Sequence, residues 1–381
     1  MRRHRFLTVV LTLLLVGGML VVPVAGVTAE ETTAAECEFP LTVEDATGEP
    51  VELSEEPDEI VVLAPNVAQH LWELDVEERV TGMPVEPWTA YLEGSEDPEN
   101  VLSFDDSEGL SLPDSETIID LDPDIVLSAS IIPEDSIDEL RDSDLTVYQH
   151  PQATSFAAIK EQVEQNGQLV GACEEADAIV EDITDRIDLV EQAVADSDQP
   201  RVFFDQGTVD GDVSSVNANA FEHELITTAG VENIAADVDD PTGYPLLSSE
   251  FVVGEDPEVI ITPGDPETET PRESISEFPG YDSMTAVQDE QIVLVDSNLI
   301  SQHAPRTVDV LEEIAEELHP DEMADARGEE SGADDTGDVD DDGATDVDDV
   351  EDDADDDGPG MTIGVAVAAL GIVAMLGRFR R

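Results

Sequence analysis

The stretch that decides the fold is EEADAIVEDITDRIDLVEQAVAD, residues 174–196. Its apolar side chains recur every three or four residues, as they do along one face of an amphipathic α-helix. They are Ala176, Ile179, Val180, Ile183, Ile187 and Val190. At a rise of 1.5 Å per residue, such a helix spans about 35 Å, the length of a small domain. We therefore predict one long helix that connects the regions on either side of it.

The regions before and after this helix repeat one pattern of secondary structure. Short apolar runs typical of buried strands occur before it at 60–64, 125–127 and 146–148, and after it at 202–204, 259–261 and 292–295. Predicted helices alternate with these strands, which is typical of parallel sheets covered on both faces. The predicted fold class is therefore α/β. Two Rossmann-like lobes with central parallel sheets, at 38–172 and 200–320, are joined by the helix at 174–196, with a ligand cleft between the lobes.

Both ends of the chain indicate export and anchoring. A basic start and an apolar run at 6–24 are followed by small residues, so we predict a signal peptide at 1–29, with a second membrane anchor as the alternative. At the other end, a disordered acidic linker at 321–358 leads into an apolar run closed by arginines. We predict that 359–381 is a sorting or membrane segment. This topology places the protein on the extracellular face of the cell membrane, anchored at its C-terminus.

The composition excludes nucleic acid as a partner. The chain has 94 acidic and 14 basic residues, for a net charge of −80, whereas phosphate contacts need Lys and Arg. A compact fold tolerates such self-repulsion when concentrated salt screens it, and haloarchaeal surface proteins are similar in this respect.

Two cysteines, Cys37 and Cys173, lie in the exported part of the chain. Oxidising conditions outside the cell favour their pairing, so we predict one disulfide. A lipid on Cys37 is the alternative, although the residues before it lack the pattern of a lipidation site. A metal site built on the two cysteines lacks further ligands at suitable spacing.

Four segments, in this order, resemble those shared by the helical-backbone (class III) substrate-binding proteins of ABC importers. They are EPDEIVVLAPN at 56–66, DLDPDIVL at 120–127, GVENIA at 230–235 and SQHAPR at 301–306. The resemblance implies a subunit that captures a small molecule and delivers it to a permease and its ATPase subunits. The resemblance extends to members that bind vitamin B12, which implies cobalamin or another corrinoid as the transported ligand and no resident cofactor. An iron(III)-siderophore or haem ligand is the alternative.

The tail carries a second resemblance. The residues GPGM at 358–361, followed by an apolar run and arginines, are similar to a haloarchaeal sorting signal that is cleaved before a lipid is attached. Met361 stands where that motif has Phe. The resemblance implies a membrane anchor at the C-terminus, whether the segment is cleaved or retained.

The first resemblance also implies which side chains hold the ligand. Aromatic rings on loops at strand ends suit a large flat ligand, and amide or imidazole groups can hydrogen-bond it. The predicted ligand-binding residues are Trp88, Tyr91, Phe104, Tyr244, Asn298 and His303. Core or rim aromatic residues are the alternative reading of the rings. Glu116 and Glu250 match family positions where one glutamate on each lobe pairs with arginines of the permease; solvated surface charge is the alternative.

We predict neither catalytic residues nor a metal site. The sequence has no Gly-x-Ser-x-Gly elbow, Gly-rich phosphate loop or His-Glu-x-x-His motif, so we do not expect an enzyme, and a surface hydrolase is the least favoured alternative. His70, His150, His223 and His303 are scattered without the spacing of metal ligands. The alternating helices and strands also oppose a purely structural surface protein, in which we expect β-rich repeats.

Overall fold

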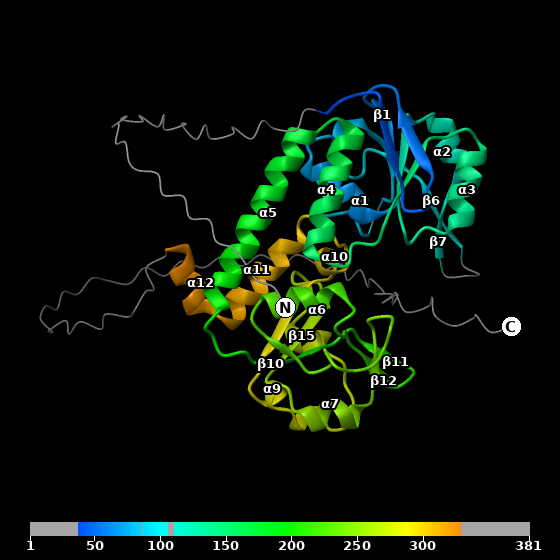
Figure 1. Ribbon diagram of the computed structural model, residues 1–381. Coiled ribbons are helices and arrows are strands. Elements are labelled where there is room, and N and C mark those ends of the chain that lie inside the picture. The colour runs from blue at the N-terminus through cyan, green and yellow to red at the C-terminus, as the bar shows by residue number, and fades with distance from the viewer. Residues whose placement is uncertain (1–36, 86, 106–109, 329–381) are drawn as a thin grey trace, which may run out of the picture. The chain divides into compact units, whose positions relative to one another are not determined.

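The computed structural model describes residues 37–85, 87–105 and 110–328, which form two α/β lobes connected by one long helix (Figure 1). Each lobe is built on a parallel sheet, and the predicted fold class is confirmed. None of the helices within these ranges is both long enough and apolar enough to cross a membrane. The predicted segments at 1–29 and 359–381 lie outside the described residues.

The N-terminal lobe is built on five parallel strands. They are β3 (Ile60–Val62), β4 (Val80–Met83), β5 (Glu99–Asn100), β8 (Ile125–Ala129) and β9 (Val147–His150). Their order in the sheet is β5-β4-β3-β8-β9. Two antiparallel hairpins pair β1 (Leu41–Glu44) with β2 (Pro50–Leu53) and β6 (Leu102–Asp105) with β7 (Leu110–Pro113). The helices are α1 (Pro65–Glu73), the short 3-10 helix η1 (Glu77–Arg79), α2 (Ser115–Leu121), α3 (Glu134–Asp142) and α4 (Phe156–Val170).

The C-terminal lobe repeats this plan with four parallel strands. They are β10 (Arg201–Phe204), β13 (Glu232–Asn233), β15 (Val259–Gly264) and β16 (Ile292–Asp296), in the order β13-β10-β15-β16. A small antiparallel sheet contains β11 (Thr208–Val209), β12 (Asp212–Ser214) and β14 (Leu246–Leu247). The helices are α6 (Phe221–Thr228), α7 (Ser249–Glu255), α8 (Pro271–Ser274), η2 (Tyr281–Ser283), α9 (Thr285–Gln288), α10 (Ser297–Ser301), α11 (Thr307–Leu318) and α12 (Pro320–Arg327).

The central strands of the first sheet are buried on both faces. Every residue of β3 and β8 is buried, which explains their continuous runs of apolar residues. Ile60 and Val62 belong to one hydrophobic cluster and Val61 to another, because successive side chains of a strand point to opposite faces. Helix α1 follows β3 closely and begins at Pro65. At this position the missing N–H of proline breaks no helical hydrogen bond.

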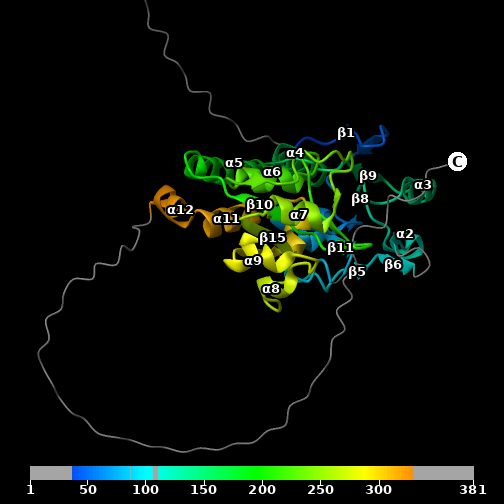
Figure 2. The same ribbon diagram turned by 90° about the horizontal axis from the view of Figure 1, so that it is seen from below.

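Helix α5 (Cys173–Val194) is the predicted connecting helix, and it starts one residue and ends two residues earlier than expected. It packs against α4 of the N-terminal lobe and against α11 and α12 of the C-terminal lobe (Figure 1 and Figure 2). Ala176, Ile183 and Val190 join a single hydrophobic cluster that also contains side chains of both parallel sheets. A Cβ atom on Gly167 of α4 would lie 2.5 Å from the Cβ of Ala176, so glycine is what allows the two helices to approach so closely.

Helix α12 corrects the predicted start of the acidic linker at residue 321. Residues 321–327 are helical, and Met323 is 1% exposed within the main hydrophobic cluster. The acidic residues that indicated a solvated linker lie partly in the first turn of this helix, where negative charge is favourable. The rest of the predicted linker, 329–358, lies outside the described residues.

The predicted disulfide between Cys37 and Cys173 is confirmed. It ties the first described residue of the chain to the first residue of α5, across a sequence separation of 136 residues. Closing so long a loop mainly restricts the unfolded chain.

Removing this disulfide should lower the free energy of unfolding by about 3–5 kcal/mol in the chain-entropy model. Urea unfolding in molar salt compares the oxidised parent with the double variant Cys37→Ser, Cys173→Ser. Dithiothreitol should destabilise the parent and leave the double variant unchanged. Equal stability of the oxidised parent and the double variant would contradict this expectation.

Candidate functional site

The carboxyl ends of the two parallel sheets meet at one junction between the lobes. From the N-terminal lobe, Trp88 and Tyr91 follow β4, and Ala153 follows β9; from the C-terminal lobe, Gln302 and His303 follow β16 and the short α10. Hydrogen bonds join these two groups of residues. Ligands of open α/β sheets bind beyond the carboxyl ends of the strands, so this junction is the candidate site.

Four hydrogen bonds form one continuous chain across the junction. The Gln302 amide donates to the Trp88 carbonyl oxygen (2.8 Å) and accepts from the Tyr91 hydroxyl (2.9 Å). That hydroxyl accepts from the Gln69 amide (2.7 Å), whose carbonyl oxygen accepts from the backbone N–H of Arg306 (2.9 Å). Gln69 and Gln302 are both buried. The chain therefore pairs polar groups that would destabilise the fold if they were left without partners.

Tyr91 is held in this chain as a protonated donor. Burial raises the pKa of Tyr91 to about 12, although the hydrogen bond from Gln69 and the charge of Arg306 oppose that rise. The guanidinium carbon of Arg306 lies 5.5 Å from the centroid of the Tyr91 ring, within the range of a cation–π contact. Gln69 was not predicted from the sequence, because a polar residue on the buried face of a helix forms no recognisable pattern.

A second polar cluster surrounds His303. Its Nδ1 lies 2.8 Å from the carbonyl oxygen of Ala153, and its Nε2 lies 3.8 Å from Oε1 of Glu222. The Tyr244 hydroxyl donates to the same carboxylate, 3.3 Å from Oε1 and 3.2 Å from Oε2. The side chains of His303 and Glu222 are 13% and 6% exposed. The structure thus brings two predicted residues together around Glu222, which the sequence analysis missed.

The environment of this cluster favours protonated His303 and Tyr244. Burial alone lowers the pKa of His303, but the contact with Glu222, the charge of that carboxylate and the Ala153 carbonyl together raise it above the usual value. Burial, and then the charge of Glu222, raise the pKa of Tyr244. The Phe221 ring packs 4.6 Å from the imidazole, measured between ring centroids.

Three large apolar side chains, one after β4, one after β8 and one on β14, are exposed. Trp88 is 43%, Ile131 64% and Leu246 48% exposed. Trp88 and Ile131 follow the parallel strands β4 and β8, and Leu246 lies two residues after Tyr244. Such side chains suit the apolar faces of a large ligand. Trp88 was predicted, whereas Ile131 and Leu246 were not, because a single aliphatic residue forms no motif.

The structure places the other two predicted ligand-binding residues, Asn298 and Phe104, on α10 and β6. Asn298 lies in α10, half-buried, and its backbone N–H donates to the Asp296 carboxylate (2.7 Å) that caps this helix. Phe104 lies on β6, and its side chain falls outside the described residues. Their roles stay predictions.

The two glutamates predicted to dock the permease occupy equivalent positions in the two lobes. Glu116 and Glu250 are each the second residue of a seven-residue helix, α2 or α7, and both are exposed. Each helix begins at a capping side chain and ends at an aspartate in the left-handed conformation, Asp122 with φ 49° and Asp256 with φ 45°. This equivalence is what a pairwise docking contact requires, and the docking role itself stays a prediction.

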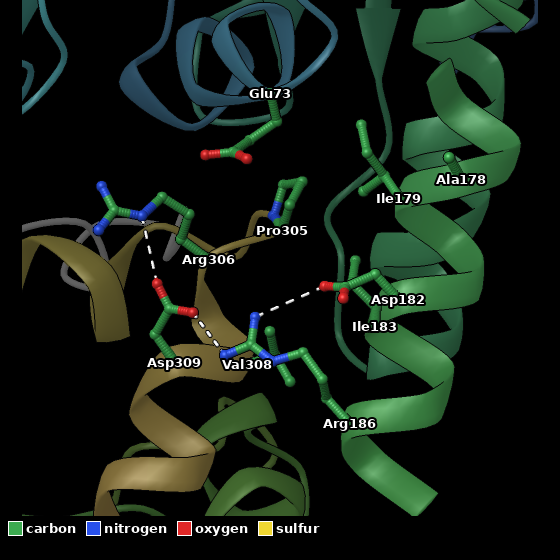
Figure 3. A pocket seen from close by; sticks show the side chains of 10 residues that line it. All are labelled: Glu73, Ala178, Ile179, Asp182, Ile183, Arg186, Pro305, Arg306, Val308 and Asp309. Atoms are coloured by element: carbon green, nitrogen blue, oxygen red, sulfur yellow. Dashed lines mark hydrogen bonds and ion pairs between the residues drawn. The ribbon is translucent and has the colours of Figure 1, made fainter. Parts of the chain in front are cut away.

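A pocket of about 320 Å³ is lined by residues of α1, α5 and α11, with the two residues that precede α11 (Figure 3). Half of the side chains that line it are charged. Arg186 of α5 pairs with Asp309 of α11 (2.7 Å), and Arg306 approaches the same carboxylate (3.2 Å). The Glu73 side chain points into the pocket from α1 (Figure 3). None of the predicted ligand-binding residues lines this pocket, and we interpret it as part of the ion-pair network that joins α5 to the C-terminal lobe.

Two of the histidines that look scattered in the sequence are neighbours in the core. His70 and His150 are both 1% exposed. Burial, and then the charge of His150, lower the pKa of His70 to about 3, and burial lowers the pKa of His150 to about 4. Across the described ranges, no group of three or more His, Cys, Asp or Glu side chains is placed to hold a metal ion.

Comparison with known proteins shows several similarities. The chain matches the periplasmic binding protein family over residues 60–299. It is 32% identical over 329 residues to a cobalamin-binding protein of Halobacterium salinarum, covering 84% of this chain and 86% of that protein. It is also similar to an ABC-type Fe3+-hydroxamate transport protein of Saccharomonospora viridis, with a TM-score of 0.60 and 25% identity, covering 74% of this chain and 99% of that one. The periplasmic vitamin B12 binding protein of Vibrio cholerae shares the fold, with a TM-score of 0.55 and 19% identity, covering 71% and 98%.

Replacing Tyr91 with Phe should lower the free energy of unfolding by about 1–3 kcal/mol, because Gln69 and Gln302 each lose a partner at the junction. Tyr281→Phe is the matched control, since Tyr281 is also a buried tyrosine (6% exposed) but takes no part in the chain across the junction. Urea unfolding in molar salt measures both variants. A loss in the Tyr91 variant no larger than in the control would rule out a structural role for this chain of hydrogen bonds.

Proposed function

This chain belongs to the periplasmic binding protein family of ABC importers, and we propose that it is a cobalamin-binding subunit. In this proposal it captures a corrinoid at the junction of the lobes and delivers it to a permease that works with ATPase subunits. Cobalamin is cargo in this reading, so neither a resident cofactor nor a catalytic residue is proposed.

The observation that carries the ligand assignment is the identity of about one residue in three with a cobalamin-binding relative, over most of both chains. The geometry of the junction supports it. The Trp88 ring, Ile131 and Leu246 offer exposed apolar surface for the faces of a large ring. The polar clusters around Gln302 and His303 offer hydrogen-bonding groups for amides at the edge of such a ring.

An iron(III)-siderophore complex is the second candidate. The similarity to an Fe3+-hydroxamate transport protein favours it, and haem is a further candidate. These ligands share the requirement for a broad, largely apolar contact surface, so the fold alone does not separate them.

We further propose that the protein works on the extracellular face of the membrane, held by the segment at 359–381 after removal of residues 1–29. The support is the sequence pattern of the two termini, which lie outside the described residues. In this arrangement the acidic stretch before the anchor keeps the two lobes within reach of the permease.

Cyanocobalamin should bind the purified protein in molar salt with micromolar or tighter affinity, and Trp88→Ala should weaken that binding at least about tenfold, which corresponds to about 1.4 kcal/mol. Ile119→Ala is the matched control, because Ile119 is likewise exposed (41%) but lies on α2. Isothermal titration with cyanocobalamin, a ferric hydroxamate and haemin measures the preference. Tight binding of the ferric hydroxamate without binding of cyanocobalamin would promote the second candidate.

Glu116→Ala combined with Glu250→Ala should leave cyanocobalamin affinity unchanged and lower uptake of labelled corrinoid by cells that lack the native copy. Each exposed pair with a permease arginine is screened by salt, so the double change is the informative one.

The matched control for this experiment is Glu134→Ala combined with Glu174→Ala, since both are exposed glutamates in the first turn of other helices. It should leave uptake unchanged. Normal uptake in the Glu116 and Glu250 double variant, at normal surface abundance, would remove these residues from docking. Lost affinity for cyanocobalamin would place them in the ligand site instead.

A further inference from the structure

The buried carboxylate of Glu222 lies between two side chains that are chemically able to ligate a metal ion, His303 and Tyr244. Proteins that hold a haem iron use a neutral imidazole or a deprotonated tyrosine as the axial ligand. The protonation of these two side chains therefore decides whether the junction can bind the metal centre of its cargo directly.

The hydrogen-bond geometry fixes the protons of His303. The Ala153 carbonyl oxygen, 2.8 Å from Nδ1, can only accept, so Nδ1 carries a proton. Nε2 faces Oε1 of Glu222 at 3.8 Å. The Tyr244 hydroxyl donates to the same carboxylate, 3.3 Å from Oε1 and 3.2 Å from Oε2. A lone pair on Nε2 would face that negative charge, whereas a proton there completes an ion pair.

The same carboxylate keeps the hydroxyl of Tyr244 protonated, because loss of its proton would place a second negative charge within 3.3 Å of Glu222. The other groups packed on the imidazole are uncharged: the Ala153 carbonyl and the ring of Phe221, with the Phe156 ring 5.1 Å from that of Phe221. Among the described residues, Glu222 is the charged group that acts on His303.

Building on the proposed capture of a corrinoid, we propose that Glu222 is a positioning residue that determines ligand specificity. It holds His303 and Tyr244 in forms that cannot ligate a metal, so the cargo is a chelate whose metal needs no ligand from the protein. Cyanocobalamin, in which both axial positions of cobalt are filled, fits this requirement. Haem that depends on a protein histidine or tyrosine does not fit it. The raised pKa values of His303 and Tyr244 agree with this arrangement.

The first test reads the protons directly in the unaltered full-length protein. Long-range proton–nitrogen correlation spectra of the histidine rings are recorded at pH 6.5, with His303→Gln to assign the signal. A pKa above the usual 6.5 keeps the ring more than half protonated at this pH. Two protonated ring nitrogens on His303 support the proposal, and a ring with one unprotonated nitrogen overturns it.

The second test reads metal ligation by absorbance, with aquocobalamin and haemin as probes at pH 6.5. The parent protein should show no spectral change that signals histidine ligation of either metal. Glu222→Gln keeps the size of the side chain and removes its charge, so His303 should then ligate the cobalt of aquocobalamin. The spectral shift should disappear in the double variant Glu222→Gln, His303→Gln. The proposal is overturned if the parent shows histidine ligation and this ligation is lost in His303→Gln. It is also overturned if Glu222→Gln folds and its His303 keeps both ring protons.

Cyanocobalamin separates this inference from the proposed function. Because its cobalt has no open position, cyanocobalamin should show no spectral change of axial-ligand exchange with either the parent or Glu222→Gln. If the parent fails to bind cyanocobalamin while His303 carries both protons, the corrinoid assignment fails and the role of Glu222 in preventing metal ligation stands.

Discussion

The apolar face that α5 shares between both lobes is the contact on which the rest of the structure depends. This helix packs against α4 on one side of the molecule and against α11 and α12 on the other, and its buried side chains belong to a cluster that reaches both sheets. A packed helix of 22 residues bends little. The two lobes are therefore held at a nearly fixed distance, and the chemistry of their junction is left to side chains at the ends of the strands.

At that junction, hydrogen bonds rather than apolar packing define how the lobes meet. The chain from Gln69 through Tyr91 and Gln302 to Trp88 pairs groups that are buried, so another register of the lobes would leave polar atoms without partners. Each such bond contributes about 0.5–1.5 kcal/mol net. A ligand that replaces one or two of these bonds must therefore recover about 0.5–3 kcal/mol through its own contacts.

The sequence predicted the parts of the fold that have a local pattern. The period of α5 and the apolar runs of β3, β8, β10 and β15 were sufficient for the fold class. Helix α4 was not predicted, because buried Gln162, Asn166 and Gly167 interrupt its apolar period. Helix α12 was taken for a solvated linker because its composition is acidic.

The candidate site was less predictable than the fold, for a physical reason. A family resemblance led to the prediction of Trp88, Tyr91, Tyr244 and His303. Their hydrogen-bond partners became apparent only from the structure. Tyr91 and Gln302 are 211 positions apart in the chain, and Glu222 is a buried carboxylate in a sequence with 94 acidic residues. Neither the contact nor the burial produces a local sequence pattern, because both arise only when α5 brings the two sheets together.

The net charge of −80 also limits how this protein can recognise its partners. In about 1 M salt the Debye length falls to about 3 Å, so charges attract across contact distances and hardly beyond them. Long-range steering of a ligand or permease is therefore weak in such salt, and an exposed glutamate would act only where it touches its partner. Buried pairs such as Glu222 with His303 are screened much less than surface charges. In salt of this concentration, the proposed site would distinguish one ligand from another mainly through buried hydrogen bonds and exposed apolar side chains such as Trp88 and Leu246.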